Sequence, residues 1–219
     1  MIPTILGLIP ARHGSQGIPG KNLKLLGGKP LIQHTIDLAL RCPCLTQVLI
    51  SSDDVAILAL AHQQQIPAIR RPLHLALDTT SMWSVMTHAL HTLPPPWPDL
   101  LVLLQPTAPR RTVQHVQTAV ELLLTHPEVS CVMSVIPLPL THAPGYVCQI
   151  SHGYLRCPQA VRRQDVTPAY LRDGTVYVYR LPLKAGGRVW PLLLHPSASL
   201  SLDTMEDWQR AEALFRNPL

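Results

Sequence analysis

The chain has 219 residues, of which 47% are hydrophobic and 14% are charged. This composition is too apolar and too weakly charged for a disordered chain, and the length favours one domain over residues 1–219. No apolar run reaches the roughly 20 residues that a membrane-spanning helix needs. We therefore expect a cytoplasmic protein with no membrane partner.

The formal net charge is +5, and it comes from arginine more than from lysine. The basic residues are dispersed in pairs such as Arg70-Arg71, Arg110-Arg111 and Arg162-Arg163, and only 5% of the chain is aromatic. Nucleic-acid-binding proteins usually gather basic residues on one face and interleave them with aromatic side chains. Because the guanidinium fork suits phosphates and carboxylates, we expect a small anionic ligand and no nucleic-acid partner.

The five cysteines are an odd number in a chain long enough to fold without cross-links. They stand at positions 42, 44, 131, 148 and 157. This count predicts reduced thiols rather than a disulfide framework. A zinc site at Cys42-Pro43-Cys44 is disfavoured, because no second cysteine pair follows at the spacing that zinc sites use.

The first predicted strand is the continuous apolar run Ile5–Ile9, a pattern typical of a strand buried on both faces of a parallel sheet. Apolar residues at helical spacing over Leu31–Leu40 and a second apolar run at Gln47–Ser51 complete one βαβ unit. The alternation then continues with a helix from a candidate N-cap at Asp54 to His62, a strand at Ile66–Ile69, a helix at Ser81–Leu93, a strand at Leu100–Leu104, a helix at Thr112–Leu124 and a strand at Val129–Val135.

The rhythm breaks over residues 137–172, which are rich in Pro, Gly, His and Arg. This segment is too short for a domain and is interpreted as an antiparallel excursion that serves as a dimerisation arm or a substrate lid. Strands at Thr175–Tyr179 and Pro191–His195 and a helix at Met205–Phe215 close the chain. Strands separated by helices predict an α/β fold with a doubly wound, mostly parallel, Rossmann-like sheet.

Ligands of such a sheet bind beyond the carboxyl ends of its strands, so the loop after the first strand, residues 10–22, is the first candidate site. Its glycines let backbone N–H groups approach an anion, while Arg12 and Lys21 bracket the loop with positive charge. The spacing matches neither a Walker A loop nor G-x-G-x-x-G. The loop predicts a polyphosphate site of another type, with an ordinary surface loop as the alternative.

The segment Ile9–Asn22 resembles the signature of the CMP-sialic acid synthetases, the acylneuraminate cytidylyltransferases. Four further blocks resemble that family in order: Ile50–Asp54; Arg71-Pro72 with Asp78–Ser81; Leu103–Arg111; and Asp173–Tyr177 with Leu202–Thr204. The resemblance implies a fold of the nucleotide-diphospho-sugar transferase type and a homodimer. It also implies Mg²⁺-dependent transfer of CMP from CTP to the anomeric hydroxyl of a nonulosonic acid, with release of pyrophosphate.

The resemblance further implies roles for individual residues. The nucleotide would be bound by Ala11, Arg12, Gly14, Ser15, Gly17, Lys21, Asn22, Arg71 and Ser81. The sugar acid would be bound by Gln105, Arg163 and Tyr177, although Tyr177 can also be interpreted as a core residue and Arg163 as a solvated one. Arg12, Lys21 and Asp203 would be catalytic, with Asp203 as the ligand of Mg²⁺. His13, also in the loop, is interpreted as a polar loop residue rather than a base.

The sequence departs from the family pattern at the metal site, where Ser201-Leu202-Asp203 replaces Asp-x-Asp and leaves one carboxylate. Other departures are Gln16 for Lys, Met82 for Ser, Ala108 for Ser and Leu171 for Arg. Two alternatives therefore stay open. The protein could be a non-catalytic nucleotide-binding homologue, or an enzyme of the same fold that uses another sugar or triphosphate.

Overall fold

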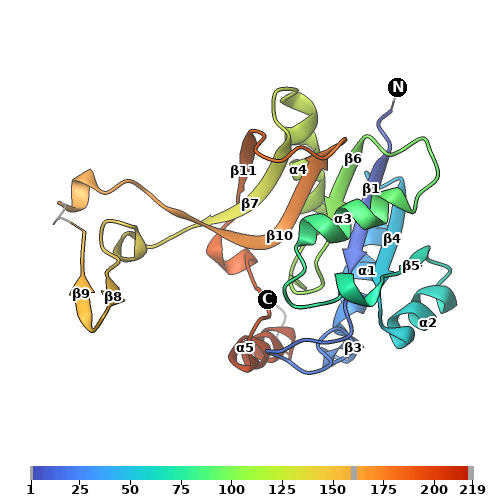
Figure 1. Cartoon of the computed structure of the whole chain (residues 1–219), viewed down its shortest axis with the longest axis horizontal. Coiled ribbons are helices and arrows are strands. Elements are labelled where there is room, and N and C mark those ends of the chain that lie inside the picture. The colour runs from blue at the N-terminus through green and yellow to red at the C-terminus, as the bar shows by residue number, and fades with distance from the viewer. Residues whose placement is uncertain (1, 159–161, 217–219) are drawn as a thin grey trace.

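The computed structural model describes residues 2–158 and 162–216, and its centre is a seven-stranded sheet in the order β11-β7-β10-β6-β1-β4-β5. Strand β1 (Ile5–Pro10) lies inside this sheet, and all six of its residues are buried. The burial explains why its sequence is apolar without alternation, since both of its faces are covered. The expected doubly wound, mostly parallel sheet is confirmed (Figure 1).

The first half of the chain forms the parallel part of the sheet. Strand β1 pairs in parallel with β4 (Gln47–Ser52) on one side and with β6 (Leu100–Leu103) on the other. Strand β4 pairs in parallel with β5 (Ala68–Arg70). The carboxyl ends of these strands therefore meet at one edge of the sheet, where the first loop also begins.

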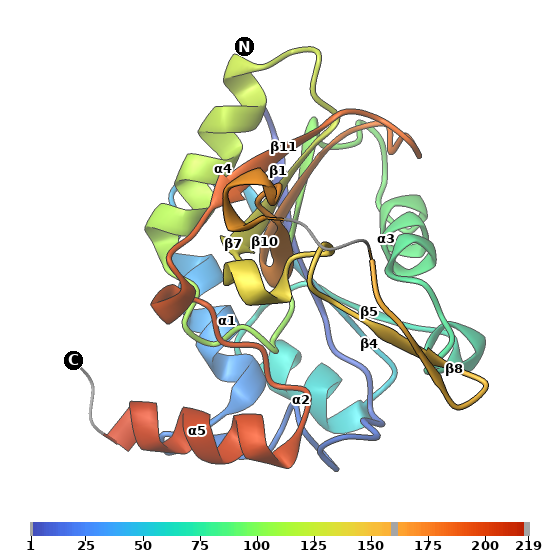
Figure 2. The ribbon, with the colours of Figure 1, turned by 90° about the vertical axis from the view of Figure 1, so that its left-hand side faces the viewer.

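Helices cover both faces of the sheet (Figure 2). The apolar faces of α1 (Leu31–Arg41), α2 (Val55–Gln63) and α4 (Val113–Thr125) pack into one core cluster, and that of α3 (Met82–His91) packs into another. The predicted cap of the second helix is confirmed, because the Asp54 side chain accepts a hydrogen bond from Ala56 N. No helix within the described ranges is long and apolar enough to span a membrane.

The second half of the chain adds β7 (Cys131–Pro137), β10 (Tyr170–Arg180) and β11 (Val189–Leu193). Strand β10 lies between β6 and β7 and runs antiparallel to both, whereas β11 is parallel to β7. The reversed strand is longer than the predicted Thr175–Tyr179, and its first residues belong to the segment that was expected to be irregular.

The predicted helix at Met205–Phe215 is confirmed as α5 (Met205–Arg216), and its Trp208 and Ala211 are buried in a third cluster. This cluster also contains Leu26 of a two-stranded hairpin, β2 (Leu25–Leu26) and β3 (Lys29–Pro30), that the sequence did not reveal. The packing places the segment before α5 beside the first loop.

The segment at residues 137–172 is an arm that projects from the body (Figure 1). It carries an antiparallel hairpin of β8 (Gln149–Ser151) and β9 (Tyr154–Arg156), which confirms the antiparallel excursion. Residues 159–161 of the predicted segment lie outside the described residues. A role of the arm in dimerisation stays a prediction.

The expectation of reduced thiols is wrong for two of the five cysteines, because Cys148 and Cys157 form a disulfide. In the hairpin, Gln149 pairs with Arg156, so the two cysteines stand directly opposite each other in the next position of the same register. Their Cα atoms are 4.3 Å apart. The remaining three cysteines are free thiols, with the sulfur atoms of Cys42 and Cys44 3.3 Å apart.

Candidate active site

A cavity of about 140 Å³ lies at the carboxyl ends of β1 and β6. It is lined by Pro10, Arg12, Gly14, Ser15, Lys21, Asn22, Arg71, Met82, Gln105, Pro106 and Thr107. The fold therefore brings together the first loop, the arginine after β5 and the amide after β6. Three cationic side chains line one small cavity, which is the arrangement that a polyphosphate requires.

The first loop is held by its own main chain. The Asn22 side chain donates a hydrogen bond from Nδ2 to Arg12 O at 2.9 Å, so the two ends of the loop are tied together. Gly20 has a φ of +61°, in the left-handed region that other residues rarely adopt. The backbone N–H of Ala11 is already used by Ser51 O at 2.9 Å, so it is not available to a ligand.

Lys21 connects the first loop to the segment before α5. Its Nζ donates a hydrogen bond to Leu202 O at 2.6 Å and lies 3.6 Å from Asp203 Oδ1. Burial lowers the pKa of Lys21, and the nearby carboxylate of Asp203 opposes part of that shift. The Leu202 N–H in turn donates to Thr107 O at 3.0 Å, so this segment is fixed against the loop after β6.

Arg12 has an acidic partner that the sequence did not single out. Its guanidinium forms an ion pair with Asp78, which also accepts a hydrogen bond from Gln16 Nε2 at 2.6 Å. Asp78 belongs to the loop before α3, so the contact closes one side of the site. A phosphate that binds Arg12 has to share the guanidinium with this carboxylate.

Arg71 is the most buried of the three cations, with 4% of its surface exposed. Its guanidinium donates to Ser51 O at 2.7 Å and to Ser51 Oγ at 3.2 Å. Burial lowers the pKa of Arg71; the Asp53 charge opposes this and the Arg12 charge adds to it. The side chain is thus fixed at the carboxyl end of β4 before any ligand binds.

Asp203 is exposed, and its Oδ2 accepts a hydrogen bond from Ser201 Oγ at 2.8 Å. No group of three or more His, Cys, Asp or Glu side chains that could hold a metal is found within residues 2–158 and 162–216. Mg²⁺ commonly binds through one or two carboxylates together with substrate phosphates and water. The single carboxylate of Asp203 fits that mode of binding.

The remaining predicted residues lie in different places. Gln105 lines the cavity, whereas Tyr177 packs into the core cluster below α3, where burial raises its pKa. Ser81 caps α3, its Oγ accepting a hydrogen bond from Ser84 N at 3.1 Å. Arg163 lies exposed in a short 3₁₀ turn of the arm, outside the residues that line the cavity.

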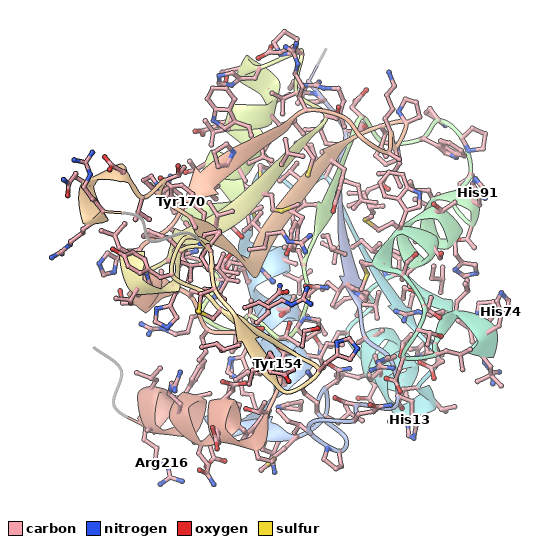
Figure 3. All side chains as sticks on the ribbon, turned by 60° about the vertical axis from the view of Figure 1, so that its left-hand side comes forward. His13, His74, His91, Tyr154, Tyr170 and Arg216 are labelled. Carbon is pink, nitrogen blue, oxygen red and sulfur yellow. A yellow bond between two sulfur atoms is a disulfide. The ribbon has the colours of Figure 1, made fainter. Side chains whose placement is uncertain are left out.

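His13 is exposed at the edge of the first loop (Figure 3). Its Nδ1 lies 2.8 Å from Asp54 Oδ2, and its N–H donates to Asp53 Oδ1 at 2.9 Å. The hydrogen bond and the charge of Asp54 raise the pKa of His13. The contacts tie the loop to the end of β4 and leave the imidazole outside the cavity lining.

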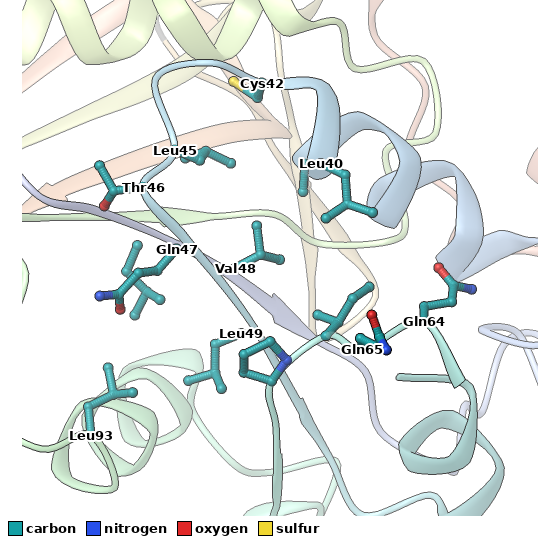
Figure 4. A pocket seen from close by; sticks show the side chains of 14 residues that line it. Leu40, Cys42, Leu45, Thr46, Gln47, Val48, Leu49, Gln64, Gln65 and Leu93 are labelled. Atoms are coloured by element: carbon teal, nitrogen blue, oxygen red, sulfur yellow. The ribbon is translucent and has the colours of Figure 1, made fainter. Parts of the chain in front are cut away.

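A larger cavity, of about 500 Å³, lies at the opposite ends of the strands (Figure 4). Its wall is mostly aliphatic and includes the start of β4, from Gln47 to Leu49, but no charged side chain. A cavity of this composition cannot neutralise a triphosphate. The chemistry therefore belongs to the smaller, cationic cavity.

Sequence reasoning missed two residues of the site region, Asp78 as the partner of Arg12 and the buried Arg111. Both belong to blocks that had been recognised. Arg111 donates a hydrogen bond to Gln105 O at 2.7 Å and another to Thr175 O. Its neighbour Arg110 looks the same in sequence, and no local pattern says which of two adjacent arginines turns inward.

A mostly parallel sheet with a glycine-containing loop and three cations at the strand ends is typical of an α/β protein that binds a nucleotide. The sequence profile of the cytidylyltransferase family matches residues 6–174. The chain belongs to this family. The recognition from sequence is thereby confirmed.

Two relatives indicate where in the family the chain stands. It is 33% identical to a CMP-N,N'-diacetyllegionaminic acid synthase of Legionella pneumophila, over 96% of each chain. It is 27% identical to an N-acylneuraminate cytidylyltransferase of Streptococcus agalactiae, over 92% of this chain and 51% of that protein. The chain thus spans about half of the second relative.

A solved structure confirms the fold at lower sequence identity. A CMP:2-keto-3-deoxy-manno-octonic acid synthetase complexed with CTP superposes with a TM-score of 0.76 and 20% identity, over 99% of this chain and 100% of the other. A second neighbour, a 4-diphosphocytidyl-2C-methyl-D-erythritol synthase of Anaerococcus prevotii, gives a TM-score of 0.65 at 14% identity, over 98% and 97% of the two chains.

Proposed function

We propose that this protein transfers CMP from CTP to the anomeric hydroxyl of a nonulosonic acid. The anomeric oxygen forms a bond to the α-phosphorus, the bond from that phosphorus to pyrophosphate breaks, and the hydroxyl proton is released. The main support for this proposal is that Arg12, Lys21 and Arg71 all line one cavity. Relatives named as synthases of CMP-sugar acids support the choice of CTP and of a sugar acid.

The three cations match the electrostatic demand of this reaction. Negative charge moves onto the leaving pyrophosphate, and donors that are already in place stabilise it without reorganisation. Arg71 and Lys21 are fixed by main-chain carbonyl groups, at 2.7 and 2.6 Å respectively. Arg12 lines the same cavity and is paired with Asp78, so an incoming phosphate would share its guanidinium with that carboxylate.

Asp203 would hold Mg²⁺ together with the phosphates of CTP and water. The ion would neutralise charge on the phosphates. Lys21, 3.6 Å from Asp203 Oδ1, keeps the carboxylate beside the cavity, and Ser201 orients its second oxygen. With a single carboxylate in the site, we expect a weaker affinity for the metal than a pair of carboxylates would give.

The arm supports a homodimer as the working form. Its large apolar side chains are exposed, among them Ile150 at 79%, Tyr154 at 76% and Leu155 at 67%. Exposed apolar side chains gathered on a projecting element usually mark an interface. A second copy that covers this arm would bury them. Arg163 lies exposed on the same arm and stays the proposed partner of the sugar carboxylate in that dimer.

Pyrophosphate release tests the proposal, with CTP, Mg²⁺ and a panel of N,N'-diacetyllegionaminic acid, N-acetylneuraminic acid and 3-deoxy-manno-octulosonic acid. We expect turnover with CTP and at least one sugar acid, and identification of the CMP-sugar by mass spectrometry. Turnover with another triphosphate only would reassign the nucleotide. CTP binding without turnover of any acid would favour the non-catalytic homologue, which Ser201 in place of a carboxylate makes the second candidate.

A further inference from the structure

The Arg111 side chain is buried and forms no direct ion pair with a residue that the structure describes, although the charge of the buried Asp173 offsets part of the effect of burial on its pKa. Only 5% of its surface is exposed, and within the described part of the chain no acidic group forms an ion pair with it. Its Nη1 is also buried and makes no hydrogen bond with any of the described residues. Burying a charge in this way costs folding free energy that an aliphatic side chain of similar length would not. A buried charge that lowers stability in this way is more often kept for function than for the fold.

The two hydrogen bonds that Arg111 does make join the ends of two strands. Its Nη2 donates to Gln105 O at 2.7 Å, just beyond the end of β6, and its Nε donates to Thr175 O of β10. Tyr177 pairs with Leu103 and Val178 with Val102 in the antiparallel ladder. The same register continued places Thr175 opposite Gln105. The guanidinium therefore joins the two main-chain segments two residues beyond the last pair of the ladder, Tyr177 with Leu103.

The opposite side of β10 is fixed at the same level. Asp173 accepts hydrogen bonds from the side chains of Ser134 and Thr175, where the ladder between β10 and β7 shifts register. Gly174 has a φ of +75°, and a Cβ there would lie 3.6 Å from Gln105 Oε1. The Gln105 amide thus packs against a glycine, and its main chain is held by Arg111.

We propose that Arg111 is a positioning residue for the sugar-acid subsite, which holds Gln105 so that its amide faces the cavity. This inference rests on the proposed function, because Gln105 is the residue that would contact the sugar acid. Arg111 also connects the site to the arm, since the strand that it joins, β10, begins in the arm. Arg111 lies outside the cavity lining, so its effect on the sugar acid passes through Gln105.

The test compares Arg111→Lys and Arg111→Met with the matched control Arg110→Met. Lysine keeps the charge but lacks the guanidinium fork that reaches two carbonyl groups, and methionine keeps the length without the charge. Arg110 donates a hydrogen bond to Ser197 O at 2.9 Å, away from Gln105. For the wild type and each variant, we measure kcat, the KM for CTP and the KM for the sugar acid that the wild type uses. We expect the sugar-acid KM to rise at least about 10-fold in Arg111→Met and less in Arg111→Lys, with the KM for CTP changed less than about twofold.

A double variant separates positioning from general destabilisation. In a Gln105→Ala background, Arg111→Met should raise the sugar-acid KM by less than about twofold, because the residue through which Arg111 acts is gone. Equal effects in both backgrounds, or equal rises in the two KM values, would overturn the inference. If Arg111→Met does not fold, Arg111→Lys is carried through the same cycle. If the wild-type protein turns over no sugar acid, the proposed function itself is contradicted, and the inference about Arg111 that rests on it is contradicted too.

Discussion

Gly17 lies directly against the main chain of Asp203, so that a Cβ at residue 17 would lie 2.0 Å from the carbonyl oxygen of Asp203. The first loop and the segment before α5 are in contact here without room for a methyl group. The same two segments are joined by the hydrogen bond from Lys21 Nζ to Leu202 O. The position of the carboxylate of Asp203 therefore depends on the glycine at 17.

Gly17→Ala should destabilise the fold by about 1–3 kcal/mol, because one of the two main chains has to move. The free energy of unfolding in urea measures the effect. Gly14→Ala is the matched control, since a Cβ at Gly14 meets no atom within 4 Å and should leave the stability within about 0.5 kcal/mol. Equal stability of the two variants would show that the loop is not held against Asp203.

Lys21 should make CTP binding sensitive to alkaline pH. Burial lowers its pKa, so its ammonium group is lost at a lower pH than that of an exposed lysine. The CTP Kd, measured by calorimetry from pH 7 to 10, should therefore rise as pH increases. Lys21→Arg should remove much of this rise, because the guanidinium stays charged over that range.

Lys21→Gln removes the charge and should weaken CTP binding by about 10- to 100-fold at pH 7. Lys24→Gln is the control, because Lys24 lies over the ring of Trp208, 5.3 Å from its centroid, and not in the cavity. A similar loss in both variants would indicate a general effect of charge on CTP binding and not a contact of Lys21.

The sequence predicted those elements that are determined by residues close together in the chain. The strand Ile5–Ile9 and the cap at Asp54 could be predicted, because a continuous apolar run and a capping carboxylate act through their nearest neighbours. The reversal of β10 could not, since strand direction is decided by the path of the arm. The disulfide of Cys148 and Cys157 likewise required the hairpin register to be known.

The candidate site shows the same division. The first loop was recognised as a block, and the structure places Arg12 and Lys21 at one cavity. Asp78 and Arg111 lie within recognised blocks, yet their partners are distant in sequence: Asp78 contacts Arg12, and Arg111 joins residues 105 and 175. Pairings of this kind follow from tertiary packing and leave no periodicity in the chain.

Ser201→Asp should restore a second carboxylate beside Asp203. Ser201 Oγ lies 2.8 Å from Asp203 Oδ2, so the two carboxylates would stand side by side and repel each other without a cation. We expect the Mg²⁺ concentration for half-maximal activity to fall about 10-fold, and the melting temperature to rise when Mg²⁺ is added.

Ser201→Asn is the matched control, with the same size and no charge, and Asp203→Asn should abolish activity at every Mg²⁺ concentration. An unchanged Mg²⁺ dependence in Ser201→Asp would place the metal ligands elsewhere. Retained turnover in Asp203→Asn would remove Asp203 from the metal site.

Ile150→Glu should convert the proposed homodimer to a monomer. Ile150 pairs with Leu155 across the hairpin of the arm, and both side chains are largely exposed. A dimer interface over this hairpin would bury Ile150, and a carboxylate there would be desolvated without a partner. Sedimentation velocity should show a dimer for the wild type and a monomer for Ile150→Glu at the same concentration.

The control is Val55→Glu, since Val55 is 70% exposed on α2, away from the arm, and should leave the dimer intact. A wild type that sediments as a monomer, or dimers in both variants, would exclude the arm as the interface.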